Sequence, residues 1–561
     1  MRQHTRPRSG RFKVAGALAL MSALVVTACS SGGSDADSGP SGEGQDPVRG
    51  GTLDIAYFPD NPTFSCVDPF QTYWIEHRSV IRNVADSLTD QNPDTGAIVP
   101  WLASKWEIST DGLDYTFTLR DGVTFSDGAP LDAAAVKTNF DAFIDLAKTS
   151  GGTAFGTSYI LGLESTTVVD PQTVTFHFTQ PNSSFLQATS TTNLALLSPA
   201  SFQKTPEERC LGNFAASGLF VLDNYTPGQS ISLSRRAGYN WGSSLSKNTG
   251  AAYLDAVKYT YVAEDSVRTG NLVSGAIDIA WPRNPLTVED QELIKNSGGY
   301  IEARSLPGVS NTLFPNVTAG KPLSDPKVRQ ALYQATDLTT NAATVFGPDY
   351  PVVAGAFNST TPFFQSQADK LGFDPDAAGQ ALDAAGWTLA PGSQYRAKDG
   401  KQLTLTYPII GQYAAGNELL QDQWRQVGID LQLKVVTQAE AIGLFKSGDY
   451  DLTSNYFTRA DPGALQFILV EALANQKAVA HNAATPEVAA QIQQLFVKAT
   501  QTTDEAQTKQ AYDDLQALLI DQGVTFPLFE RQQLAGLSNK VNGFRFTSES
   551  FMSLNDTWIQ Q

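Results

Sequence analysis

The sequence predicts an α/β fold with more than one lobe. A chain of 561 residues is too long for a single hydrophobic core, so two or three lobes are expected. Between residues 403 and 435 the pattern predicts strand, helix and strand in turn. In the stretch 99–136, Asp-Gly turns separate strands and an amphipathic helix comes after them. These observations favour two α/β lobes joined by crossing segments, an arrangement that suggests a hinge.

The N-terminus predicts export. Basic residues precede an apolar run at 14–28, which is the pattern of a secretory signal peptide and is too short for a comfortable membrane span. Small residues lead directly to Cys29, so the site resembles a bacterial lipobox in which Cys29 becomes the acylated first residue; a plain signal peptide is the alternative. We expect a lipoprotein signal peptide at 1–28 and, because Ser, Gly, Asp and Glu dominate the next segment, a disordered tether at 29–48.

Composition excludes several classes of function. With 57 acidic and 39 basic side chains the formal charge is -18, which argues against nucleic acid and against broad attraction to anionic lipid. Only four histidines occur, one of them at His4 in the predicted signal peptide, so capture of a metal by several histidines is unsupported. No G-x-S-x-G or H-E-x-x-H motif occurs, which argues against a secreted hydrolase. We expect no enzyme activity, no metal and no cofactor.

Two further cysteines, Cys66 and Cys210, lie beyond the predicted signal peptide. Export would place them in an oxidising compartment, where a disulfide between them is expected. Two separate free thiols are the alternative, since the sequence does not show that their Cα atoms come within bonding range.

Period-two patterns mark the first strands. Thr52 to Tyr57 is predicted to be the first strand of the folded part. In the segment 115–119, Tyr and Phe alternate with Thr, which indicates a strand with one buried face, and a helix is expected from Asp132. The segment 174–178 repeats the alternation and sets His177 on the opposite face from the aromatic residues, where we expect it to face solvent.

One long motif resembles a known family. The order P-x-L-A-x-x-W-E from Pro100, followed by D-G-x-x-Y-T-F-x-L-R-x-G-V-x-F-x-D-G-x-P-L over 111–131, is similar to the hallmark of the peptide, nickel and opine class of solute-binding proteins that serve ABC importers. The resemblance implies a bilobal periplasmic-binding-protein-like fold with two hinged α/β lobes and an accessory domain.

The resemblance continues through the chain and implies its domain organisation. Family-like segments occur at 274–281, at 325–332, where Asp325 would cap a helix, and at 448–462. The expected first lobe comprises 49–91 with 206–308 and 525–561, the accessory domain 92–205, and the second lobe 309–524.

Strand ends and loops of the family pattern provide the candidate ligand-binding residues. These are Tyr73, Trp74, Trp281, Asn311, Phe314, Asn316, Tyr456, Phe457, Arg459 and Asp461. Peptide-binding relatives commonly place an aspartate about three positions before the Asp-Pro pair to hold the α-amino group, whereas this chain has Thr458 and then Arg459. A guanidinium suits a carboxylate or phosphate and repels an ammonium, which suggests an acidic ligand group near Arg459. A structural pair between Arg459 and Asp461 is the alternative.

The expected function is capture of oligopeptides or a peptide-like solute in a cleft that closes on the ligand, followed by delivery to an ABC permease and ATPase. We expect a monomer at the extracytoplasmic face of the cell membrane, held by its lipid anchor only. An opine, an anionic compound, an oligosaccharide or a metal chelate is an alternative cargo, and a non-transport sensor is an alternative role.

Overall fold

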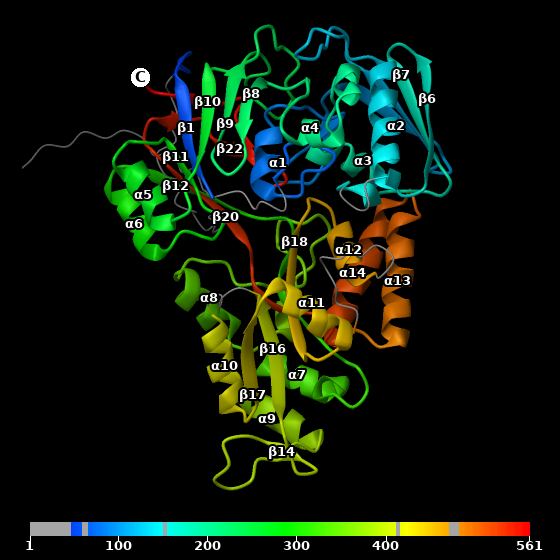
Figure 1. Cartoon of the computed structure of the whole chain (residues 1–561). Coiled ribbons are helices and arrows are strands. Elements are labelled where there is room, and N and C mark those ends of the chain that lie inside the picture. Colours follow the sequence, from blue (N-terminus) through cyan, green and yellow to red (C-terminus); the bar gives the residue numbers. More distant parts are fainter. Residues whose placement is uncertain (1–45, 59–64, 150–153, 411–415, 471–481) are drawn as a thin grey trace, which may run out of the picture. The chain divides into compact units, whose positions relative to one another are not determined.

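The computed structural model describes residues 46–58, 65–149, 154–410, 416–470 and 482–561 (Figure 1). Cys29, the predicted signal peptide and most of the predicted tether lie outside these residues. The described residues form an α/β protein, which confirms the predicted fold class. One hydrophobic core is built from residues before 301 and after 534, and a second core from residues 313–529, as expected for two lobes.

The larger lobe is organised around a seven-stranded mixed sheet. Its strands, in spatial order, are β12 (Tyr300–Ser305), β20 (Gln532–Leu537), β11 (Ile279–Trp281), β1 (Thr52–Tyr57), β10 (Ala256–Tyr261), β9 (Ser230–Arg235) and β8 (Phe220–Thr226). The predicted first strand is confirmed as β1, which pairs in parallel with β10 and β11 and lies beside β10 in Figure 1. Around this sheet lie the helices α1 (Ile75–Ile81), α5 (Asp265–Val273) and α6 (Val288–Asn296).

A four-stranded antiparallel sheet contains the motif that carries the family resemblance. Its order is β4 (Ala103–Ile108), β5 (Asp114–Leu119), β7 (Thr173–Phe178) and β6 (Leu163–Asp170). The apolar residues of β5 and β7 are buried and pack under α2 (Ala133–Thr149), whose first turn is capped by Asp132. His177 lies on the other face with its side chain 40% exposed, as predicted, and its Nδ1 is 2.7 Å from the Asp114 carboxylate.

The second lobe contains a parallel pair of strands and several helices. As predicted, β16 (Thr404–Ile410), α10 (Asn417–Gln426) and β17 (Asp430–Val436) form a strand–helix–strand unit. A three-stranded antiparallel sheet lies in the order β18 (Leu452–Thr458), β13 (Gly308–Pro315) and β19 (Phe526–Phe529). The helices of this part are α7 (Pro326–Gln334), α8 (Leu338–Phe346), α9 (Pro375–Ala384), α11 (Gln438–Ser447), α12 (Gly463–Leu469), α13 (Pro486–Thr500) and α14 (Glu505–Asp521). Helices α13 and α14 pack side by side (Figure 1).

Short elements complete the described chain. The strands of two or three residues form four antiparallel pairs: β2 (Thr89–Gln91) with β3 (Ile98–Pro100), β14 (Ala397–Lys398) with β15 (Lys401–Gln402), β21 (Val541–Asn542) with β24 (Trp558–Ile559), and β22 (Arg545–Phe546) with β23 (Met552–Ser553). The short helices are α3 (Phe185–Ala188) and α4 (Pro206–Cys210), and the 3-10 turns are Thr157–Ile160, Thr192–Leu194, Pro199–Gln203, Pro322–Ser324 and Ala368–Lys370.

The start of α7 provides a test of local stability. Asp325 is the N-cap, as predicted, and its Oδ1 accepts a hydrogen bond of 2.9 Å from the Lys327 N–H. Replacing Asp325 with alanine leaves that donor without a side-chain acceptor, so we expect the free energy of unfolding to fall by about 1 kcal/mol. Urea unfolding followed by fluorescence measures it. Asp325→Asn should behave as the wild type because asparagine caps equally well, and an equal loss in both variants would contradict this account.

Candidate binding site

Arg459 and Asp461 form a buried ion pair just after β18. The guanidinium donates from Nε to Asp461 Oδ2 at 2.8 Å and from Nη2 to Oδ1 at 3.1 Å, a bidentate geometry. Its Nη1 donates to Ser158 Oγ at 2.8 Å, and its Cζ lies 4.0 Å from the centre of the Tyr159 ring. The two charged residues are 5% and 2% exposed. This is the structural pair that the sequence analysis gave as the alternative. In it the positive charge of Arg459 is neutralised by Asp461 and is not free to bind a ligand.

A second group of charged and aromatic side chains gathers around Tyr456. Tyr456 comes from β18, and close backbone packing fixes this strand: at Gly308, with φ of +109°, a Cβ would lie 2.1 Å from the Phe457 carbonyl oxygen. Tyr456 as a whole residue is 42% exposed, whereas its hydroxyl end lies among neighbouring side chains. Arg283, two residues beyond β11, and Arg531, two residues beyond β19, both lie near its hydroxyl.

Arg283 is held by a carboxylate and a ring. Its Nη1 lies 3.3 Å from both carboxylate oxygens of Glu76 on α1, and its Cζ lies 3.7 Å from the centre of the Trp74 ring. Glu76 is 1% exposed, whereas the Arg283 side chain is 23% exposed. The buried carboxylate and the stacked ring therefore orient a cation that still reaches solvent.

Arg531 is held without a carboxylate. Its Nη1 donates to Thr458 Oγ1 at 2.7 Å, and its Cζ lies 3.9 Å from the centre of the Tyr456 ring. The main chain at Arg531 is fixed on both sides, because its N–H donates to Asn358 Oδ1 and its carbonyl accepts from Leu306. Among the ion pairs of the described residues, none includes Arg531.

The two arginines change the pKa of the groups between them. Burial of the Tyr456 hydroxyl acts to raise its pKa, but the positive charges of Arg283 and Arg531 outweigh burial and lower it below the usual value. Burial lowers the pKa of Arg531, and the like charge of Arg283 lowers it further. Burial raises the pKa of Tyr73, and the tyrosine lies within the influence of both arginines. These side chains therefore share one electrostatic environment.

The residues predicted for the site fall into separate groups. Tyr73, Trp74 and Tyr456 lie with the two arginines. Tyr73 also packs edge-on against Phe155 at 5.0 Å, and Phe457 stacks on Phe467 at 4.8 Å. Asn311 is partly exposed in β13, where the pairing with β19 shifts register.

Three other predicted residues are packed inside the protein. Trp281 is 0% exposed between Tyr57 and Phe546, with ring centres 6.1 and 6.0 Å away. Phe314 is 0% exposed in a hydrophobic core. Asn316 is also 0% exposed and donates to the carbonyls of residues 448 and 450. Their surroundings are those of structural residues.

Arg283 and Arg531 were not predicted from the sequence. The sequence did contain a signal for them. Each arginine lies two residues beyond the end of a buried strand, and ligand-binding residues were expected near strand ends. The contacts of the two arginines lie far away in the sequence, so they became apparent only from the fold.

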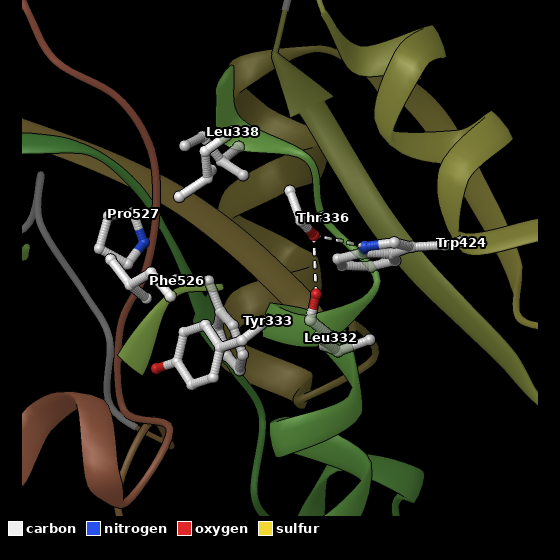
Figure 2. A pocket seen from close by; sticks show the side chains of 9 residues that line it. Leu332, Tyr333, Thr336, Leu338, Trp424, Phe526 and Pro527 are labelled. Carbon is white, nitrogen blue, oxygen red and sulfur yellow. Dashed lines mark hydrogen bonds between the residues drawn. The ribbon is translucent and has the colours of Figure 1, made fainter. Parts of the chain in front are cut away.

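The recess in Figure 2 belongs to the core of the second lobe. It is lined by Leu332, Tyr333, Thr336, Leu338, Leu371, Trp424 and 526–528. Thr336 Oγ1 accepts from Trp424 Nε1 at 2.9 Å and donates to the Leu332 carbonyl at 2.7 Å, as the dashed lines show. Its polar groups are thus used by the protein itself. Another recess, beside Arg459, is lined by Ser158, Tyr159, Asn182, Asp461, Gln466 and Phe467 among others.

Other features bear on the class of site. Cys66 and Cys210 are joined by a disulfide with an S–S distance of 2.02 Å, which links the segment before α1 to the end of α4.

Within the described ranges, no three His, Cys, Asp or Glu side chains are grouped so that they could hold a metal ion. Over the same ranges, every helix is too short or too polar to span a membrane.

Comparisons with known proteins identify the family. The chain is similar to the glutathione-binding protein GsiB of Escherichia coli K12, with 25% identity over 475 residues that cover 82% of this chain and 86% of the relative. It is also similar to the nickel-binding periplasmic protein of the same strain, with 24% identity over 77% of this chain and 81% of the relative. NikA from Brucella suis, solved in complex with Fe(III)-EDTA, shares the fold with a TM-score of 0.78 and 24% identity, and covers 91% of this chain and 100% of that one.

These likenesses fit the bilobal fold of periplasmic binding proteins, which confirms the predicted architecture of two α/β lobes. The relatives are solute-binding proteins and not enzymes. The sequence model of the bacterial extracellular solute-binding proteins, family 5 (middle region), matches residues 97–472, about two thirds of the chain, so the protein belongs to this family of solute-binding proteins of ABC importers.

Proposed function

We propose that the protein captures oligopeptides or a peptide-like solute in a cleft between its two lobes, closes on that solute and delivers it to an ABC permease and ATPase. One observation carries the proposal: aromatic and charged side chains from the segments at 73–76, 283, 456 and 531 converge around Tyr456. Such convergence from distant parts of a chain is typical of a small-molecule site. A ligand that contacts both lobes stabilises the closed state by its differential affinity.

The relatives support a peptide-like cargo and keep alternatives open. GsiB is named for glutathione, which is a tripeptide, and its similarity extends over most of this chain. NikA was solved with an anionic metal chelate. A nickel or other metal chelate, an opine, another anionic compound or an oligosaccharide is therefore the alternative cargo, and a sensor with the same fold is the alternative role.

The proposal includes the location and the domain organisation. The signal peptide at 1–28 would direct export, Cys29 would carry the lipid, and 29–48 would tether a monomer to the extracytoplasmic face of the cell membrane. The first lobe would comprise 49–91, 206–308 and 525–561, with the accessory domain at 92–205 and the second lobe at 309–524. The separation of the four-stranded sheet from the seven-stranded sheet supports an accessory domain beside the first lobe. The segment 526–529 pairs with β13 and packs into the second core, so the last crossing to the first lobe would follow β19.

Within the cleft, we assign ligand contact to a narrower set than the sequence predicted. It comprises Tyr73, Trp74, Asn311, Tyr456 and Phe457, together with the two arginines. Arg459 and Asp461 would shape the cleft through their mutual ion pair, and Trp281, Phe314 and Asn316 would support its walls.

Native mass spectrometry of protein purified from its own host tests the proposal. We expect a complex with one small molecule, which denaturation should release intact for identification. A protein that carries no solute and binds no member of a peptide and opine library would contradict the proposed function. Adjacent genes for a permease and an ATPase would favour transport, whereas an adjacent histidine kinase gene would favour the sensor.

A further inference from the structure

Among the described residues, the group around Tyr456 carries more positive than negative charge. Two guanidinium groups, of Arg283 and Arg531, act on the Tyr456 hydroxyl. Among the residues that the structure describes, the one carboxylate within ion-pair distance of either arginine is that of Glu76, which pairs with Arg283. Glu530 precedes Arg531, but its carboxylate accepts from the N–H and hydroxyl of Ser359. The surplus charge is notable because the protein as a whole has a formal charge of -18.

The nearby cations do not alter this balance. Arg78 and Arg82 are both paired with Glu549, at 3.4 and 3.7 Å. Arg459 is paired with Asp461 at 2.8 Å. Of the arginines described in this region, Arg531 is therefore the one whose guanidinium contacts a hydroxyl and a ring but no carboxylate.

A cation surrounded by protein without a counter-charge is costly, because the protein dipoles replace water only in part. The structure nevertheless fixes Arg531 in place through the Thr458 hydroxyl and the Tyr456 ring. Arg283 is fixed in the same way by Glu76 and by the Trp74 ring. Two oriented guanidinium groups can donate several parallel hydrogen bonds to a planar oxyanion, and little side-chain entropy remains to be lost on binding.

We propose that Arg283 and Arg531 together bind a carboxylate group of the solute beside Tyr456, and that the protein therefore selects solutes with a free carboxylate. This inference rests on the proposed function, since it names the chemical class of the solute for the same cleft. An α-amino group is disfavoured at this position, because two positive charges repel it. A peptide would accordingly enter with its carboxyl end toward the arginines.

A binding experiment with matched libraries tests the inference. Purified, solute-free protein is incubated with a random tripeptide library of free acids and, separately, with the same library amidated at the C-terminus, and retained peptides are identified by mass spectrometry. We expect retention from the free-acid library and, for a selected free acid, at least about tenfold weaker binding of its amide by calorimetry.

The variant that isolates the subsite is Arg531→Gln. We expect it to weaken binding of the selected free acid by about 30-fold, with Arg531→Lys intermediate because lysine keeps the charge and loses the guanidinium fork. Without solute, Arg531→Gln should unfold at about the same temperature as the wild type, because the lost contacts with Thr458 and Tyr456 are offset by removal of a cation that has no counter-charge. Arg235→Gln, which removes a partly exposed cation paired with Asp255 at 2.9 Å on the far part of the sheet, is the control and should bind as the wild type.

The outcomes separate the two proposals. Equal retention of acids and amides, or unchanged affinity in Arg531→Gln, would overturn the carboxylate subsite while the solute-binding function stands. The carboxylate subsite would also be overturned if solute-free Arg531→Gln unfolded at a markedly lower temperature and Arg531→Lys lost as much affinity as Arg531→Gln. Arg531 would then have a structural role. No retention from either library would contradict the proposed peptide cargo, and the inference would fall with it.

Discussion

Replacing Asp461 with alanine is expected to lower the free energy of unfolding by about 3–5 kcal/mol, because it leaves the Arg459 guanidinium buried without its counter-charge. The substitution also removes the acceptor for the N–H of Gly463, at 2.8 Å, at the start of α12. Chemical denaturation followed by circular dichroism measures the effect. The large size of the loss reflects the burial of both groups, since an exposed pair would lose little.

A double variant separates the buried charge from the loss of packing. We expect Arg459→Met combined with Asp461→Ala to recover most of the stability, because the uncompensated cation is gone. Asp141→Ala is the matched control: its pair with Lys137 is exposed, at 2.7 Å, and its loss should cost less than about 1 kcal/mol. If Asp461→Ala cost no more than this control, the pair would not be a structural element, and Arg459 would again be a candidate for ligand contact.

Asp86 is expected to make stability depend on pH in the neutral range. Its carboxyl is 1% exposed, and burial raises its pKa to about 7 although Trp241 Nε1 donates to it at 3.0 Å and Arg82 and Arg236 lie near. In the unfolded chain the pKa is about 3.9, so the folded protein holds a proton that the unfolded chain releases between about pH 4 and pH 7. The contribution of Asp86 to the free energy of unfolding is therefore largest below about pH 4. It falls as the pH rises from about 4 and is lost once the pH has passed about 7.

The variant Asp86→Asn should remove this dependence. Asparagine is neutral at every pH and keeps an acceptor for Trp241, so its stability should match the wild type near pH 4 and exceed it by up to about 4 kcal/mol at pH 8, at about 1.4 kcal/mol per pKa unit. Urea unfolding of both proteins from pH 4 to pH 8 gives the difference. Asp223→Asn, on an exposed position of β8, is the control. A difference between Asp86→Asn and the wild type that is the same at pH 5 and pH 8 would contradict the explanation.

Local elements of the fold were predictable because their patterns depend on near neighbours. The alternation that defines β5, the strand–helix–strand unit at 404–436 and the cap at Asp325 are all set within a few residues. The order of the seven-stranded sheet was not predictable from such patterns, since β20 pairs with strands more than 200 residues earlier in the chain. That pairing depends on long-range packing.

The grouping of the candidate side chains was predictable only in part, for a related reason. Tyr73, Trp74 and Tyr456 were predicted from the strand ends and loops of the family pattern, and the structure brings them together with Arg283 and Arg531. Trp281 meets the same criterion, yet the core encloses it, and sequence does not distinguish an aromatic residue that ends a strand inside the protein from one that faces solvent. The charge balance that singles out Arg531 depends on which carboxylates lie within a few ångströms, which no spacing along the chain specifies.

The position of β20 also sets the order in which the chain can fold. This strand, Gln532–Leu537, fills the place between β11 and β12 and bonds to both, so until it arrives those two strands each present an unsatisfied backbone edge. The seven-stranded sheet can therefore be completed only after nearly the whole chain has been synthesised. Pairing over more than 200 residues is also slow to form, so completion of this sheet is expected to be a late step in folding.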